Sequence, residues 1–183
     1  MPTPIRVTFT ASGVGPYQID SMSTLAGEPL ARATHLTVHE GIWHESADAV
    51  WSLRGVSGHV RYVEQAEKQR LAAVTPPLGR PEATHAALIP IRKSEAWWNL
   101  AQDERRAILE SRSQHIAIGM RYLPAVARRL SHSRELGEAF DFVTWFEYAP
   151  EHAGAFEELL HALRASDEWR YVEREVDIRL RRT

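Results

Sequence analysis

Phe142-Val-Thr-Trp-Phe-Glu-Tyr148 decides the fold, because it has the length of a strand and carries apolar side chains on both alternating faces. A strand of this kind is buried from two sides. Residues 150–165 follow as an amphipathic helix, whose apolar side holds Phe156, Leu159, Leu160 and Leu163. Residues 171–180 then alternate, with Val172, Val176, Ile178 and Leu180 on one face and Glu173, Glu175, Asp177 and Arg179 on the other. This strand–helix–strand order indicates an α+β fold.

Similar signals extend toward the N-terminus. Strands are predicted at residues 5–11, from Val50 onward and at 86–91, and helices at 60–74 and 102–122. Pro90 suggests that its strand lies at a sheet edge or near a strand end, because proline donates no ladder hydrogen bond. Residues 21–49 are weakly patterned and are predicted as loops with short elements. The whole pattern predicts helices covering a mainly antiparallel sheet.

The composition is that of an ordinary globular chain. Its 183 residues fit one large domain or two small fused halves. Lysine and arginine number 22 against 24 acidic residues, a formal net charge of −2 that implies no nucleic-acid partner. The absence of cysteine excludes disulfides, thiolate metal sites and a haem attached through a C-x-x-C-H motif.

The N-terminal 20 residues contain no charged start followed by an apolar run, and we therefore expect no signal peptide. No stretch approaches the roughly 18 apolar residues that a membrane span requires. A cytoplasmic location without membrane contact is the resulting expectation.

His115 is the leading candidate for chemistry. The predicted helix 102–122 places it mid-helix on an inward stripe, with small Ser111 one turn before it and Gly119 one turn after it. Small neighbours let a flat ligand approach closely, and a helix-borne imidazole is a good haem-iron ligand. From spacing alone, a core histidine bonded to a neighbour is the commoner role.

Three further groups of side chains could line a site. Arg128 and Arg129 follow a helix and enter a strand, so one can point into a pocket, where a guanidinium suits an oxyanion, while the other stays in water. Trp97 and Trp98 offer flat walls to a large apolar ligand. Glu168 would raise the basicity of His115 if it reached the ring N–H. Each also has an ordinary structural role, as a solvated charge or a core indole.

Other common motifs are absent. The chain holds no H-E-x-x-H or H-x-H pattern, and His35 and His39 flank a β-branched stretch that favours a strand over a metal-binding helix. Gly13-Val-Gly15 lacks the third glycine of a dinucleotide loop.

Taken in order, several segments from residue 50 onward resemble the chlorite dismutase family, in particular its short, dimeric branch. These segments are Trp51-Ser-Leu-Arg-Gly55, His59-Val-Arg-Tyr62, Ala87-Leu-Ile-Pro-Ile-Arg-Lys93-Ser-Glu-Ala-Trp97-Trp98, His115-x-x-Ile-Gly119, Arg128-Arg-Leu-Ser-His132-Ser, Asp141-Phe-Val-Thr-Trp-Phe-Glu-Tyr-Ala-Pro-Glu-His152 and Glu168-Trp-Arg-Tyr-Val-Glu-Arg-Glu-Val-Asp177. Residues 1–49 contribute little to the resemblance. Ser131 departs from it, because an aromatic residue is expected there.

The resemblance implies a duplicated ferredoxin-like dimeric α+β barrel with a shortened N-terminal half, divided at residues 1–95 and 96–183. It implies one haem b per chain, with His115 as the axial iron ligand, Glu168 as its hydrogen-bond partner and Arg128 as the distal catalytic arginine. Further haem-binding residues would be Lys93, Trp97, Trp98 and Tyr62 near the haem edge and propionates, and Phe146 with Thr144 on the distal side.

The implied activity converts chlorite to chloride and dioxygen, with the O–O bond formed at the haem iron in a homodimer. A coproheme decarboxylase-like enzyme is the nearest alternative, although that group is longer and generally lacks an arginine at the position of Arg128. A haem-binding or haem-sensing protein without chlorite turnover is another alternative. A haem-free barrel in which His115 belongs to the core is the third.

Overall fold

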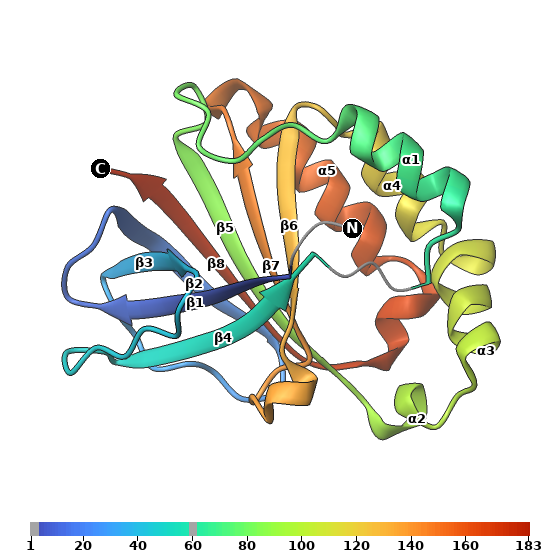
Figure 1. Ribbon diagram of the computed structural model, residues 1–183, viewed down its shortest axis with the longest axis horizontal. Coiled ribbons are helices and arrows are strands. Elements are labelled where there is room, and N and C mark those ends of the chain that lie inside the picture. The colour runs from blue at the N-terminus through green and yellow to red at the C-terminus, as the bar shows by residue number, and fades with distance from the viewer. Residues whose placement is uncertain (1–3, 59–61) are drawn as a thin grey trace.

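Eight antiparallel strands close into a barrel in the order β1-β3-β2-β8-β5-β7-β6-β4 in the computed structural model, which describes residues 4–58 and 62–183. The strands are β1 (Ile5–Ser12), β2 (Tyr17–Ala26), β3 (His35–Glu40), β4 (Trp51–Ser57), β5 (His85–Lys93), β6 (Val126–His132), β7 (Phe142–Tyr148) and β8 (Val172–Arg182). The helices are α1 (Gln65–Val74), α2 (Glu95–Trp98), α3 (Gln102–Arg106), α4 (His115–Arg121) and α5 (Ala153–Arg164). Figure 1 shows α1, α4 and α5 gathered beside β6, on the far side of the barrel from β2 and β3.

Strand β7 divides the apolar residues into two cores, as the sequence predicts. Val143 and Trp145 point into the barrel and pack in its interior core. Phe146 and Tyr148 belong to a second core with Phe156 of α5. Because successive strand residues face opposite sides, one strand supplies both the barrel interior and the layer beneath the helices.

Residues 85–182 run in the order strand, helices, strand, strand, helix, strand, which is the order of a ferredoxin-like unit. β5 pairs with both β7 and β8, and β8 continues the sheet to β2. The predicted α+β barrel is confirmed by this closed sheet and by the likeness to solved structures described below. Its division at residue 95 stays a prediction.

The prediction for residues 21–49 is wrong in one respect, because β2 is a ten-residue strand rather than a loop. Most of its side chains are exposed or half-buried, so they carry no strong apolar alternation. Pairing with β8 over most of its length, from Tyr17 opposite Arg182 to Ala26 opposite Glu175, fixes this strand instead. The predicted strand at His35 to His39 is confirmed as β3.

Two further predictions need correction, the place of β5 in the sheet and the start of α1. β5 is an interior strand, not an edge, although its register with β8 lapses between Leu88 and Ile91, around Pro90. Helix α1 begins at Gln65 rather than residue 60, whose placement lies outside the described residues. Tyr62 has a positive φ of 61°, and Glu64 acts as the N-cap, so the helix cannot extend back through them.

The single helix predicted over 102–122 is interrupted. Helix α3 passes into a π-helical segment (Ala107–Arg112), and Gln114 then takes a left-handed conformation with φ 51°. Helix α4 begins only afterwards, at His115. Apolar spacing alone gives no sign of this break, because i, i+3 and i+4 patterns survive on both sides of it.

Candidate functional site

His115 is the first residue of α4, not a mid-helix residue as predicted. Ser111 lies in the π-helical segment and is exposed, so it does not form the small inward neighbour that a straight helix would give. The buried small residue here is Ser113. The His115 side chain is 27% exposed and therefore remains reachable from outside the core.

Glu168 and His115 come together as predicted. The Nδ1 atom of His115 lies 2.6 Å from Oε2 of Glu168, which is only 3% exposed. The Glu168 backbone N–H donates to Oγ of Ser113 at 2.9 Å, which ties the carboxylate-bearing segment to a residue two positions before His115. With Nδ1–H donated to a carboxylate, the ring keeps a lone pair on Nε2 for a metal.

Lys93 completes a triad with Glu168 and His115, and its predicted place near the haem edge and propionates stays a prediction. Its Nζ atom donates to Oε1 of Glu168 at 2.5 Å, and it stands 3.7 Å from the ring centroid of Trp97. Its side chain is only 3% exposed. Lys93 therefore acts on the His115 partner from within the protein.

The charges of the triad reinforce one another. Burial would raise the pKa of Glu168, but the charges and hydrogen bonds of His115 and Lys93 lower this pKa to about 2. Burial lowers the pKa of Lys93, an effect that Glu168 and Asp141 oppose. Glu168 is thus an anion throughout the neutral range and holds the His115 ring in one orientation.

The two tryptophans occupy different surroundings. Trp97 is 1% exposed, and its Nε1 finds no hydrogen-bond partner among the described residues. Its ring meets Tyr62 edge-on at 6.2 Å between centroids. Trp98 donates from Nε1 to Oδ2 of Asp141 at 3.1 Å and stacks on Phe142.

Tyr62 joins this cluster through Arg105, whose Nη1 donates to the phenol oxygen at 3.0 Å. Arg105 also donates to the carbonyl oxygens of Trp97 and Trp98. The neighbouring segment His59 to Arg61, which contributes to the resemblance, lies outside the described residues.

Arg128 and Arg129 point to opposite sides, as predicted. Arg129 pairs with Glu40 at the surface. The Arg128 guanidinium lies against α4, where an ideal Cβ on Gly119 would stand 2.6 Å from its Nη2. It makes no hydrogen bond or ion pair with the residues that the structure describes, and burial lowers its pKa. A free guanidinium facing the helix of His115 can bind an anion.

Phe146 and Thr144 share the helix-side face of β7, opposite Arg128 and Leu130 in the register. Phe146 is 4% exposed and its ring packs on Phe156, so it lies in the core beside Arg128. The departure at Ser131 is accommodated by Gly55, where an ideal Cβ would lie 2.6 Å from the serine Cβ.

Sequence reasoning missed Ser113, Asp141, Arg105 and Glu110 as supporting residues. Asp141 accepts both the Lys93 backbone N–H at 2.7 Å and the Trp98 indole, although 48 residues separate it from Lys93. Contacts at such separations leave no local signal. Only the adjacency of Asp141 to the strand motif at 142–148 drew attention to this segment.

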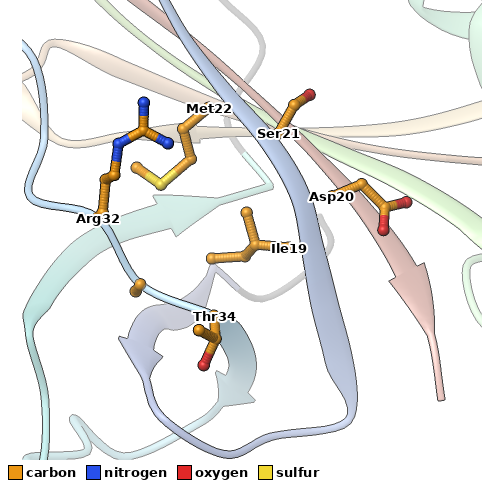
Figure 2. A pocket seen from close by; sticks show the side chains of 7 residues that line it. Ile19, Asp20, Ser21, Met22, Arg32 and Thr34 are labelled. Atoms are coloured by element: carbon orange, nitrogen blue, oxygen red, sulfur yellow. The ribbon is translucent and has the colours of Figure 1, made fainter.

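Two surface hollows are lined by residues outside the triad. Figure 2 shows one at β2, lined by Ile19, Asp20, Ser21, Met22, Arg32, Ala33 and Thr34. Another holds Tyr62 and Arg106 but none of the triad. The side chains, not the hollows, therefore define the candidate site. None of the helices in the described parts of the chain has the length and apolar character needed to cross a membrane.

Comparison with known proteins gives a consistent result. A family model described as chlorite dismutase matches residues 31–182. The chlorite dismutase of Ideonella dechloratans is 30% identical over 132 residues, which are 68% of this chain and 42% of that protein. The matched region thus covers less than half the length of this curated relative.

Solved structures extend the likeness to the whole chain. A crystal structure of dimeric chlorite dismutase from Nitrobacter winogradskyi is 56% identical, covers 97% of this chain and 99% of its own, and has a TM-score of 0.89. A mutant chlorite dismutase from Candidatus Nitrospira defluvii in complex with cyanide is 20% identical, with coverage of 98% and 91% and a TM-score of 0.66. At that lower identity the likeness concerns the fold alone.

An eight-stranded barrel with a histidine–carboxylate–lysine triad on its helical side defines a protein of the dimeric α+β barrel class. Within this class, the chain belongs to the chlorite dismutase family, a family of haem b oxidoreductases. The predicted family is confirmed.

Proposed function

We propose that this chain binds one haem b through His115 and converts chlorite to chloride and dioxygen. Membership of the chlorite dismutase family supports this activity. The single observation that carries it is the triad of His115, Glu168 and Lys93, together with the free guanidinium of Arg128, which lies on β6 and packs against α4.

The residues present fit a haem. His115 donates through Nδ1, which leaves Nε2 for axial ligation. Trp97 holds a buried N–H that lacks an acceptor among the described residues, as a donor toward a propionate would. Trp98 and Tyr62 lie in the same cluster and would border the edge of the group. Phe146 would contribute an apolar wall.

Each of these residues has a definable task. Glu168 holds the ring proton and makes His115 a stronger electron donor, and Lys93 keeps Glu168 ionised. Arg128 would bind chlorite by charge and keep the oxygen-containing fragments from leaving, because a fixed cation stabilises changing negative charge. The haem, when bound, supplies the redox chemistry that breaks the Cl–O bond and forms the O–O bond.

The assembly and location are part of the proposal. We infer a homodimer, because the similar Nitrobacter winogradskyi protein is described as dimeric. The two ferredoxin-like halves divided at residue 95 remain part of the proposal, with haem held mainly by the C-terminal half, where His115 and Glu168 lie, and with Lys93 contributed from the end of the N-terminal half. A cytoplasmic location is inferred from the sequence.

The test is oxygen release from chlorite, followed with an oxygen electrode on the chain loaded with haem. We expect the wild type to release dioxygen, Arg128→Ala to keep its Soret band and lose most turnover, and His115→Ala to lose haem or its normal ligation. A fully loaded wild type without oxygen release would leave a haem-sensing role. The absence of a Soret band after haem addition would refute haem binding itself.

A further inference from the structure

The helix break before His115 creates a carboxylate clamp that no motif indicates. Glu110, in the π-helical segment, accepts the Ile116 backbone N–H on Oε2 at 2.8 Å and the Ala117 N–H on Oε1 at 3.3 Å. The Glu110 carbonyl also accepts the Gln114 N–H at 2.9 Å. One residue thus spans the break from both its side chain and its backbone.

The clamp supplies acceptors that the short helix lacks. The first N–H groups of a helix have no partner within it, and in α4 the first helical bond comes from Ile118 to Gln114. Glu110 accepts two of the earlier N–H groups, and its negative charge suits the positive end of the helix. The clamp therefore fixes how α4 starts, and His115 is its first residue.

A second anchor lies at the break itself, directly before the left-handed Gln114. Ser113 is 4% exposed, and its Oγ accepts the backbone N–H of Glu168 at 2.9 Å. Glu110 holds helix α4, which carries His115, while Ser113 holds the segment that carries Glu168. Gln114, which follows Ser113, takes a left-handed conformation, which is unfavourable for a non-glycine residue and persists only where its surroundings enforce it.

We propose that Glu110 is a positioning residue that sets the orientation of the His115 ring toward Glu168, and through it the donor strength of the axial ligand. This inference rests on the proposed haem function but concerns a residue outside the triad. Apolar packing of Ile116 and Ile118 holds α4 against the core. Packing leaves the rotation of the first turn less determined than two hydrogen bonds to one carboxylate do.

The chain offers a matched control. Glu104 accepts the backbone N–H of Ala101 at 2.7 Å at the start of α3, so it also caps a helix, but no triad residue lies there. Loss of either cap removes helix-terminal hydrogen bonds. Only loss of Glu110 should alter the His115–Glu168 pair.

The experiment compares Glu110→Ala, Glu110→Gln and Glu104→Ala with the wild type. In the haem-free chain, proton NMR of the His115 ring reports its hydrogen bond to Glu168 through a strongly downfield Nδ1–H signal. In the haem-loaded chain, resonance Raman of the ferrous state reports the iron–histidine stretch, and a redox titration reports the midpoint potential.

We expect Glu110→Ala to lose the downfield signal, lower the stretching frequency, raise the midpoint potential and weaken haem binding about tenfold, the lower end of the effect of outer-shell partners. Glu110→Gln should fall between, because its amide keeps one acceptor oxygen. Glu104→Ala should match the wild type in all four readouts.

Equal spectra for the Glu110 and Glu104 variants would overturn the positioning role, even if all of them bind haem. Failure of the wild type to bind haem would overturn the proposed function separately, because the NMR comparison uses the haem-free chain.

Discussion

Glu168→Gln tests the triad most directly, because it keeps the side-chain volume and removes the charge. The pKa of Glu168 lies at about 2 instead of 4.5. At 1.36 kcal/mol per pH unit, the ionised carboxylate contributes on the order of 3 kcal/mol to folding at neutral pH. The variant also leaves Lys93 buried without a counter-charge, and breaking a buried pair costs about 3–5 kcal/mol. We expect the variant to be less stable by about 3 kcal/mol at pH 7.

The pH dependence has a definite sign. A carboxylate whose pKa is lowered on folding stabilises the protein above its unfolded pKa, and this contribution is lost as pH falls toward the folded pKa. For Glu168 the window therefore runs from about pH 5 down to pH 2. A little under half of the contribution should be gone by pH 3.5. The variant lacks this group, so the difference in free energy of unfolding between wild type and Glu168→Gln should narrow over the same pH range.

The assay is urea unfolding of the haem-free chains between pH 7 and 3.5, followed by circular dichroism. Glu173→Gln is the control, because this carboxylate pairs with Arg92 at the surface and should change stability by less than about 1 kcal/mol. Lys93→Met combined with Glu168→Gln should be more stable than Glu168→Gln alone. A gap below about 1 kcal/mol at pH 7, or one that stays constant down to pH 3.5, would refute the reasoning.

Three other changes probe the surroundings of the triad. Gly119→Ala places a methyl group against the Arg128 guanidinium and should reduce oxygen release at least tenfold. The free energy of unfolding, measured in urea, should change by no more than about 1 kcal/mol, because alanine favours a helix. Unchanged turnover would contradict the contact. Trp97→Phe removes an N–H without a partner among the described residues. Its loss should reduce the free energy of haem binding, measured by spectroscopic titration, more than the free energy of unfolding. A variant that binds haem as tightly as the wild type would argue against a propionate contact. Glu67→Gln breaks the two-pronged pair with Arg106 and should speed proteolytic cleavage within α1, measured by mass spectrometry, with the barrel strands still protected.

Much of the fold followed from local pattern. The strand at Phe142–Tyr148, the helix after Pro150 and the final alternating strand were all predicted near their observed bounds, because each buries a contiguous apolar face. Ten-residue β2 was missed, since its half-exposed side chains leave its existence to pairing with β8.

The polar face of β8 shows a similar limit. Glu175 and Asp177 are 2% and 5% exposed and pair with Arg164 of α5. Alternation predicted which way these side chains point, but not that they are buried. Their burial depends on a helix that supplies the opposite charge.

By itself, the sequence determined the class of the molecule and the family, and it singled out His115, Glu168 and Arg128 as candidate site residues, because ordered motifs survive in the linear chain. Only the tertiary structure decided that Lys93 completes a buried triad, that the helix breaks before His115, and that Glu110 binds the start of α4 while Ser113 binds the Glu168 segment. The physical reason is that hydrogen-bond geometry between side chains brought together by folding has no counterpart in residue spacing.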